Sequence, residues 1–466
     1  MRASPGIGAS VCSHDKKKTM SDFDMVIRGS LISADSILED GWLGIMDGRI
    51  AAMGSHSPPA ARDQVDARGL WVLPGAVDSR TYIGGWADGC GIGRASRAAA
   101  AGGVTTLVDM PYEHAEVVAS RAQLDAMVSR IGREAHVDVA VAGTVNTEHG
   151  LDAADALARG GVCAFSIPTF EAERQRFAHH ESDLLQAFQG IARFGLACSM
   201  HNHARLTVSR NARRLLNAGR PGREVLARAN LPLIEGLTTR LLCRVGAAAG
   251  VRMQAADVWS EQGYALCARY RQAGHWVTIE TSLRSLMMSI EDALQQFGGT
   301  PDDYPLLRPR VEVDALWRRL ATDMGTFVSS GYLARGDDGG EWPAPMVDYG
   351  PDLLLPALWS GCESRGLSPC LVVRLLSQKP AEHFLLDDRK GSLDIGKDAD
   401  FVVLAPGRSA SRQTEHVGQP HTVHVFGTWR RGQLVYDGSR VHGEPGTGHY
   451  LRPRAVSREG HGATVM

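Results

Sequence analysis

Three polar residues that close short apolar segments could together perform acyl-transfer chemistry. Ser166, His201 and Asp257 each stand at the end of such a segment. As residue types they supply a nucleophile, a base and a group that orients the base. If the segments are strands of one parallel sheet, the three side chains converge on one pocket. The alternative is that they are hydrogen-bonded residues with no catalytic role.

Arg80 closes another apolar segment and adds a permanent cation to this set. Its guanidinium could offset the charge of Asp257 while it donates forked hydrogen bonds to a substrate carboxylate or carbonyl. The alternative is a salt bridge that fills the pocket.

A single metal ion held by His201, His203 and Asp257 is another arrangement that these residue types allow, since zinc accepts three protein ligands and one water. It requires His203 to turn back toward the site after the strand has ended. We therefore predict no metal ligand in this group.

Short apolar runs alternate with longer helical patterns through the middle of the chain, which is typical of βαβ units and a parallel sheet. Eight runs indicate an α/β fold of the closed (β/α)₈ barrel type, with reactive groups at the C-terminal ends of its strands. The runs are 70–78, 103–110, 137–143, 162–167, 195–201, 251–257, 276–281 and 326–331.

Both ends of the chain are rich in β patterns. Asp47-Gly48 predicts a hairpin turn near the N-terminus, and further strands are predicted after Ala399. We expect the two ends to pair into one small composite β-sandwich domain. The predicted division is a disordered extension at 1–20, the β-sandwich at 21–72 and 388–452, the barrel at 73–387 and a flexible tail at 453–466. Met1 and Met20 are both candidate starts.

Composition disfavours several classes of partner. The chain has 50 basic and 52 acidic residues in 466, so there is no electrostatic case for nucleic acid or a membrane surface. No apolar stretch approaches the roughly 20 residues of a membrane span, and no signal-peptide pattern is present. The eight cysteines are scattered, without a CxxC pair, as expected of reduced thiols. We expect a cytoplasmic protein that binds a small molecule.

A series of short motifs follows one another between residues 24 and 452. No single motif is specific, but the ordered set resembles the cyclic amidohydrolases, the group of hydantoinases (dihydropyrimidinases), allantoinases and dihydroorotases. The resemblance implies a (β/α)₈ barrel, a cyclic amide-like substrate and association into homo-oligomers, as dimers or tetramers. The motifs are Gly48-Arg49-Ile50 with Gly54, Pro74-Gly75 to Asp78, 101–111, 305–308 with Leu316-Trp317, Lys379-Pro380-Ala381, and 390–400.

The same resemblance implies two metal ions, yet most of their ligand positions are replaced. In the family the ligands are a His-x-His on strand 1, a carboxylated lysine on strand 4, histidines on strands 5 and 6, and an aspartate on strand 8. Asp323 resembles the strand-8 aspartate of the family, but spacing from Leu316-Trp317 assigns that aspartate's position to Gly331. We expect no metal and no other cofactor. The corresponding residues are Arg80 and Tyr82, Ser166, the retained His201, Asp257, and Gly331.

The sequence is compatible with two functions. One is a metal-independent hydrolase of the C–N bonds of a cyclic amide, ureide or imide, or a binder of such a ring, with Arg80 as electrophile and His201 or Asp257 as base. The other is a catalytically inactive paralogue that serves as a structural or regulatory subunit. The expected substrate-binding residues are Tyr82, His203, Glu280 and Tyr332.

Overall fold

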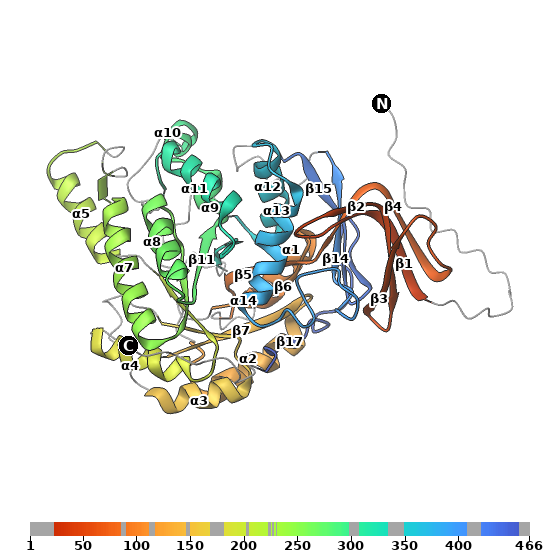
Figure 1. Ribbon diagram of the computed structural model, residues 1–466, viewed down its shortest axis with the longest axis horizontal. Helices are drawn as coiled ribbons and strands as arrows, with labels where there is room; N and C mark the ends of the chain where they lie inside the picture. The colour runs from red at the N-terminus through yellow and green to blue at the C-terminus, as the bar shows by residue number, and fades with distance from the viewer. Residues whose placement is uncertain are drawn as a thin grey trace.

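A small β domain and a larger α/β barrel lie side by side in the computed structural model of this protein (Figure 1). No helix among the described residues is long and apolar enough to cross a membrane. The described residues are 23–84, 90–110, 117–145, 150–167, 181–201, 205–221, 225, 228–229, 231–297, 307–333, 349–407 and 421–455.

Eight parallel strands follow one another around the barrel in chain order, which confirms the predicted (β/α)₈ architecture. A short strand just after the eighth, β13 (Tyr332–Leu333), pairs with the first and brings the two ends of the sheet together. The eight are β5 (Ala76–Tyr82), β6 (Val104–Asp109), β7 (Asp138–Thr144), β8 (Ala164–Ser166), β9 (Ala197–His201), β10 (Arg252–Ala256), β11 (Val277–Ser282) and β12 (Thr326–Ser329).

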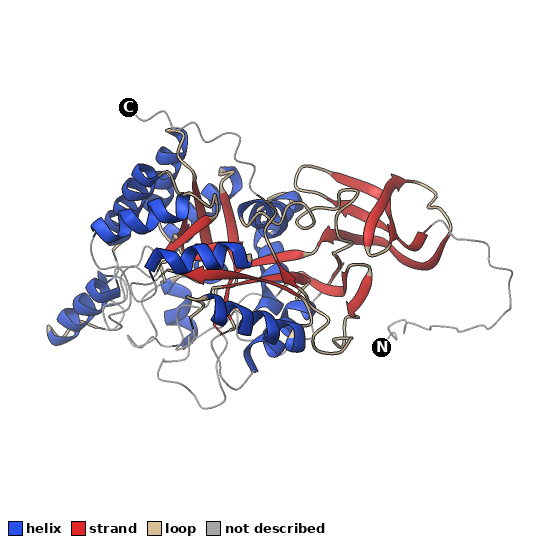
Figure 2. Ribbon diagram, turned by 90° about the horizontal axis from the view of Figure 1, so that it is seen from below, coloured by secondary structure: helices blue, strands red, loops and turns tan. Residues whose placement is uncertain are grey.

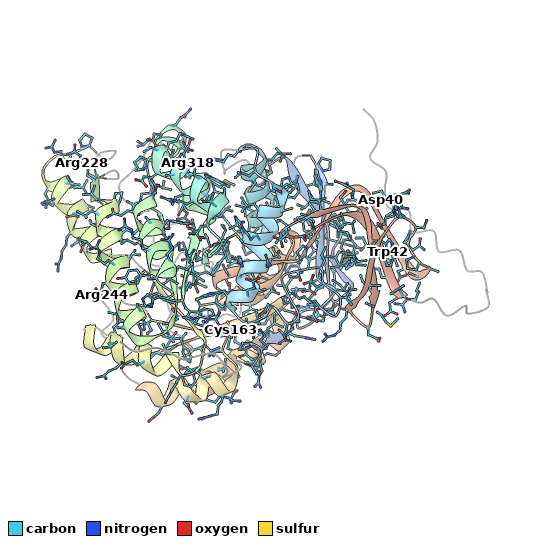
Figure 3. All side chains as sticks on the ribbon, in the orientation of Figure 1. Asp40, Trp42, Cys163, Arg228, Arg244 and Arg318 are labelled. Atoms are coloured by element: carbon cyan, nitrogen blue, oxygen red, sulfur yellow. The ribbon has the colours of Figure 1, made fainter. Side chains whose placement is uncertain are left out.

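Helices surround this ring of strands (Figure 2). Their outer faces carry charged side chains such as Arg244 and Arg318, whereas Cys163 is buried within the barrel (Figure 3). The main ones are α1 (Cys90–Ala101), α2 (Arg121–Glu134), α3 (Gly150–Gly160), α4 (Glu181–Ala192), α5 (Arg205–Asn217), α7 (Pro232–Ala249), α8 (Glu261–Gln272), α10 (Ile290–Phe297), α11 (Arg310–Thr322) and α12 (Pro351–Glu363).

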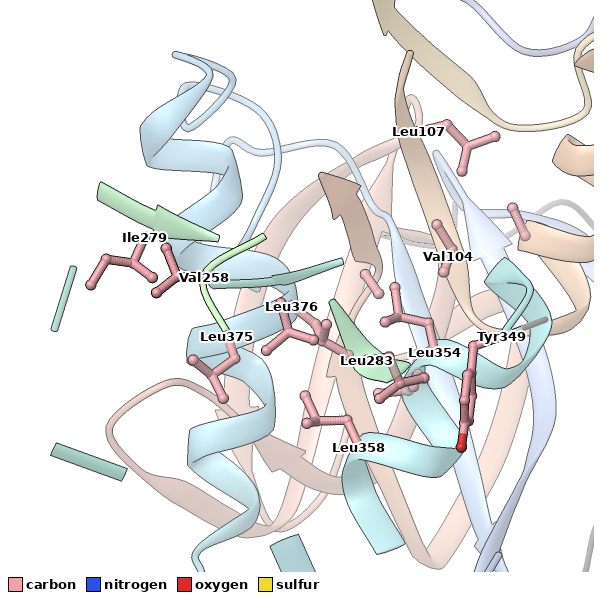
Figure 4. Close-up of a cluster of buried hydrophobic side chains, with 14 of the residues drawn as sticks. Val104, Leu107, Val258, Ile279, Leu283, Tyr349, Leu354, Leu358, Leu375 and Leu376 are labelled. Atoms are coloured by element: carbon pink, nitrogen blue, oxygen red, sulfur yellow. The ribbon is translucent and has the colours of Figure 1, made fainter. Parts of the chain in front are cut away.

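Four shorter helical segments also lie in the described part of the chain: α9 (Leu283–Met287), α13 (Pro369–Val373), the π-helix η1 (Arg374–Gln378) and α14 (Lys379–His383). Leu283 of α9 and Leu376 of η1 join Leu354 and Leu358 of α12 in the apolar core outside the strands (Figure 4). Burial of such side chains is the main favourable term in folding, at roughly 25 cal/mol per Å² of apolar surface.

Alternation along the strands decides which side chains face the inside of the barrel. On β7, Val139 and Val141 belong to the outer core shared with the helices, whereas Ala140 and Ala142 belong to a separate cluster. The same alternation holds on β9, where Cys198 lies outside and Ala197 inside. Successive strand residues point to opposite faces, so every second residue of these strands lines the interior.

The β domain is one seven-stranded sheet that draws strands from both chain ends, as predicted. β4 from the N-terminal part pairs antiparallel with β14 from the C-terminal part. The order is β16 (Gln433–Tyr436), β15 (Val423–Arg430), β14 (Phe401–Pro406), β4 (Ala61–Pro74), β1 (Phe23–Ile32), β2 (Ile37–Met46) and β3 (Arg49–Ser55). A further strand, β17 (Tyr450–Leu451), returns to pair with β7 of the barrel.

Candidate functional site

Arg80 forms the centre of a buried ionic cluster at the C-terminal ends of the barrel strands. It lies near the end of β5 and is only 4% exposed. Both terminal nitrogens donate to the carboxylate of Asp257, and Nε lies 3.1 Å from Oε2 of Glu280. Nη1 also donates to the hydroxyl of Tyr82 at 3.1 Å. We call Arg80, Asp257 and Glu280 the mouth cluster.

Asp257 reaches this cluster because the chain turns sharply after β10. Its φ is +55°, in the left-handed region that non-glycine residues rarely adopt. Its backbone N–H donates to Oε2 of Glu280 at 2.9 Å, and the indole of Trp259 donates to its Oδ1 at 3.3 Å. A strained backbone held by several hydrogen bonds is typical of functional sites.

A second buried ion pair holds the turn that carries Asp257. Oε1 of Glu235 accepts the backbone N–H groups of Trp259 at 3.0 Å and Ser260 at 3.2 Å. Nη2 of Arg308 donates to the other carboxylate oxygen of Glu235 at 2.7 Å. These charge-assisted hydrogen bonds therefore fix the conformation of the turn.

Glu280 is fully buried on β11, and burial raises its pKa to about 7. Arg80 acts in the opposite direction, whereas the charge of Asp257 raises the pKa further. The hydroxyl of Ser329, on the neighbouring strand β12, donates to Oε1. This carboxyl group can therefore exchange a proton near neutral pH.

Asp78 is another buried carboxyl group on β5, two residues before Arg80. Burial raises its pKa to about 6, although the N–H and hydroxyl of Ser330 both donate to it. Tyr332, an expected substrate-binding residue, follows on β13 and donates its N–H to the Ser330 hydroxyl. Asp78 thus ties the last barrel strand to the first.

The described side chains at these strand ends do not fit the two-metal centre that the resemblance implies. Arg80 occupies a predicted ligand position, and its guanidinium binds Asp257, which occupies another. Gly331 stands where the resemblance implies the strand-8 aspartate. A Cβ there would lie 3.1 Å from Nη2 of Arg80. Among the described residues no group of three or more His, Cys, Asp or Glu side chains could hold a metal ion. The guanidinium fills space beside the position where the resemblance implies an aspartate.

Asp323 lies where the spacing predicted, in the turn before β12. It caps α11, and Arg271 donates to its carboxylate at 2.5 Å. It is therefore an ion-paired residue remote from the mouth cluster.

The proposed triad of Ser166, His201 and Asp257 stays a prediction. Ser166 is buried and pairs in register with Ser199, two residues before His201. His201 ends β9 in register with Ala256, next to Asp257, but its side chain and the whole of His203 lie outside the described part of the chain. The carboxylate of Asp257 binds Arg80, which is the salt bridge considered as the alternative for Arg80.

Three members of this network were not expected from the sequence. Trp259, Ser329 and Ser330 each donate to a buried carboxylate of the site. Ser329 and Ser330 directly precede Gly331, which spacing from Leu316-Trp317 assigns to a strand end. The sequence therefore carried a signal for these two residues. Trp259 has no comparable signal, because its contact depends on the turn at Asp257.

Comparisons with known proteins agree with this architecture. The model of the amidohydrolase family matches residues 321–435. An allantoinase of Rubrobacter xylanophilus is 31% identical over 468 residues, covering 94% of this chain and 100% of the relative. A D-hydantoinase of Streptomyces coelicolor is 29% identical, covering 92% and 98%. The solved L-hydantoinase (dihydropyrimidinase) of Arthrobacter aurescens superposes with a TM-score of 0.83 at 22% identity, covering 92% and 100%.

The barrel, the composite β domain and a polar site at the strand ends define an amidohydrolase-type protein. The full-length match to an allantoinase narrows this class, and the chain belongs to the cyclic amidohydrolase family.

Proposed function

We propose that this protein opens a small cyclic amide, ureide or imide by hydrolysis of a C–N bond, without the two metal ions of its family. The full-length similarity to allantoinases and hydantoinases supports the substrate class. The observation that carries the metal-independent part is the guanidinium of Arg80, which binds Asp257 and Glu280 between the strand ends.

Asp257 is the proposed general base, with His201 as the other candidate. Its side chain is 9% exposed, compared with 4% for Arg80 and 0% for Glu280, so a ring that enters the barrel mouth reaches it first. Arg80 binds its carboxylate through two charge-assisted hydrogen bonds.

The proposed reaction consumes one water. Asp257 accepts a proton as the water oxygen bonds to the ring carbonyl carbon, and it returns that proton to the ring nitrogen as the C–N bond breaks. The products are a carboxylic acid and an amine or amide N–H, so atoms and charges balance. Arg80 stabilises the base here, because its donors are directed at protein acceptors rather than at a substrate oxygen.

The experiment combines metal analysis with a ring-opening assay. Purified full-length protein is tested on allantoin, hydantoin and dihydrouracil before and after treatment with a chelator. We expect unchanged turnover after chelation and a loss of at least 100-fold in kcat/KM for Asp257→Asn, in line with the removal of a general base. The matched control is Asp323→Asn, which changes an ion-paired aspartate at the other end of the barrel and should retain activity.

Two metal ions per chain, or activity lost to the chelator and restored by zinc or manganese, would refute the metal-independent mechanism. The His201 side chain would then have to be a ligand in an arrangement different from the one proposed.

A second candidate is a protein that binds such a ring, or serves as a structural or regulatory subunit, without turnover. The observation that favours it is the full engagement of the Arg80 guanidinium, which leaves the proposed electrophile bonded to Asp257, Glu280 and Tyr82. Ring binding with no product in the same assay would decide for this candidate.

We also propose a cytoplasmic location, a homo-oligomer of two or four chains, and contacts to the ring from Tyr82, His203, Glu280 and Tyr332. The near balance of 50 basic and 52 acidic residues supports a small-molecule partner over nucleic acid.

A further inference from the structure

One side of the barrel interior carries four neutral polar residues that lie in register on neighbouring strands. Thr144 on β7 pairs in register with Ser166 on β8, and Ser166 pairs with Ser199 on β9. Ser199 in turn pairs with Gln254 on β10. Residues in register on adjacent strands project to the same face of a sheet. We call Thr144, Ser166, Ser199 and Gln254 the polar row.

The row faces the inside of the barrel. Ala142, Ala164 and Ala197, each two residues before a member of the row, belong to the interior cluster. The residues between them, Phe165 and Cys198, pack outside against the helices. Because strand side chains alternate, the hydroxyls of the row point inward.

Two atoms of this row have no hydrogen-bond partner. They are Oγ1 of Thr144, which is 1% exposed, and Nε2 of Gln254, which is 0% exposed. The other amide atom of Gln254, Oε1, lies 3.0 Å from Nε2 of His383. A buried polar group without a partner destabilises the fold, so proteins usually pair it with water or a ligand.

Resting on the function proposed above, we propose that the polar row is the subsite that binds the amide edge of the ring substrate. Hydroxyl groups both donate and accept, and a side-chain amide offers both kinds of atom. A ring edge that alternates C=O and N–H groups, as in a cyclic ureide or imide, is complementary to neighbouring members of such a row. The mouth cluster then lies at the strand ends, on β5, just after β10 and on β11, beside the bond to be broken.

The charges of the site select for a neutral ring. No member of the polar row is charged. The cation of the mouth cluster, Arg80, is bonded to Asp257 and Glu280. The buried carboxyl groups of Asp78 and Glu280 would repel a carboxylate. A ring that carries its own carboxylate should therefore bind more weakly than the same ring without it.

The first experiment uses that matched pair of rings. Dihydrouracil and dihydroorotate differ by one carboxylate, and hydantoin serves as a second neutral probe. We expect dihydroorotate to bind wild-type protein at least ten-fold more weakly than dihydrouracil. Binding is measured as Kd by equilibrium dialysis, or as KM where the ring opens. Equal or tighter binding of dihydroorotate would overturn the proposed preference for a neutral ring.

The second experiment removes hydroxyls from the row. Thr144→Val keeps the shape of the side chain and should weaken hydantoin binding about ten-fold, the value of one hydrogen bond. Ser199→Ala should act in the same direction. Without ligand, Thr144→Val should keep or raise Tm, because it deletes an unpartnered buried hydroxyl. If the hydroxyl had only a structural role, its removal would lower Tm. Weaker binding at an undiminished Tm therefore indicates that the hydroxyl contacts the ring.

Thr106→Val is the matched control. Oγ1 of Thr106 is also buried and unpartnered, but Thr106 lies level with Asp138 at the start of β7, roughly 20 Å below Thr144 along the strand. It should leave ring binding unchanged. If wild type binds hydantoin and Thr144→Val and Ser199→Ala bind it equally well, the row holds water only and the subsite is wrong. If wild type binds none of the rings, the proposed function itself fails, and this inference with it.

Discussion

Two buried ionic clusters lie at opposite ends of the barrel strands and differ in their balance of charge. The base cluster lies at the start of β7 and joins three cations, Lys390, Arg430 and Arg431, to three carboxylates, Asp138, Asp398 and Asp400. Nζ of Lys390 lies 2.7 Å from Asp138, 2.7 Å from Asp400 and 3.0 Å from Asp398. The mouth cluster has one cation, Arg80, for two carboxyl groups, Asp257 and Glu280.

The titration behaviour of the two clusters follows this balance. Burial works against the charge of Asp138, but Lys390 and Arg431 hold its pKa well below the usual range. Burial likewise opposes the charge of Lys390, and its carboxylate partners raise its pKa above the usual value. At the mouth, burial of Glu280 prevails and raises its pKa to about 7. Within the base cluster, burial and the charge of Asp138 raise the pKa of Asp400, whereas Lys390 acts in the opposite direction. The base cluster has one cation for each carboxylate, whereas the mouth cluster has an excess of acid that can exchange a proton.

The largest expected effect comes from removal of the central cation of the base cluster. Lys390→Met leaves three buried carboxylates without it, and breaking a buried ion pair costs about 3–5 kcal/mol. We expect a loss of that size in the free energy of unfolding, measured with urea at pH 7.5. Arg80→Met should cost less, because Glu280 can take up a proton near neutral pH. The control is Lys379→Met, whose partly exposed partner Glu382 makes a loss of about 1 kcal/mol or less the expectation.

Equal losses for Lys390→Met and Lys379→Met would show that the base cluster contributes no more than a surface pair. Equal losses for Lys390→Met and Arg80→Met would remove the distinction between the two clusters.

The next effect concerns pH and has opposite signs for Glu280 and Asp138. The folded-state pKa of Glu280, about 7, lies above the ordinary value of 4.5 for this carboxyl group, so the folded protein binds more protons between these pH values. Its contribution to stability therefore falls as pH rises from about 4.5 to 7. Asp138 has a lowered pKa, so its contribution is present above its unfolded pKa and is lost only as pH falls through the folded one.

Glu280→Gln isolates the mouth contribution, because the amide resembles the protonated acid. Relative to wild type, this variant should gain stability as pH rises from 5 to 7.5, as measured by urea unfolding at both values. Asp78 and Asp109 also have raised pKa values, but both proteins contain them, so their effect cancels in the comparison. A difference that does not change with pH would show that Glu280 stays ionised.

The sequence predicted the barrel because its pattern repeats eight times, and each repeat is local. It also placed Arg80 and Asp257 at strand ends and allowed for a salt bridge between them. It could not predict that Asp257 adopts a left-handed backbone, or that Trp259 and Glu280 both bond to it. Those contacts depend on the register between β10 and β11 and on a turn without glycine, which no local pattern encodes.

The polar row illustrates the same limit. Ser166 was singled out by its place at a strand end, whereas Thr144 and Ser199 passed unnoticed because nothing in their own segments marks them. Only the register of three strands places them at one level. Long-range register is set by the packing of the whole sheet.

The smallest predicted effect tests how firmly the mouth cluster holds its guanidinium. Gly331 has a φ of +64°, and a Cβ there would lie 3.1 Å from Nη2 of Arg80. Gly366 has the same φ, with no atom within 4 Å of a Cβ. Gly366→Ala therefore measures the backbone cost alone, about 1 kcal/mol. Gly331→Ala adds the displacement of Arg80, and we expect a further loss of about 1 kcal/mol in urea unfolding. Equal losses in the two variants would mean that Arg80 moves aside freely, and that its bonds to Asp257 and Glu280 do not fix it.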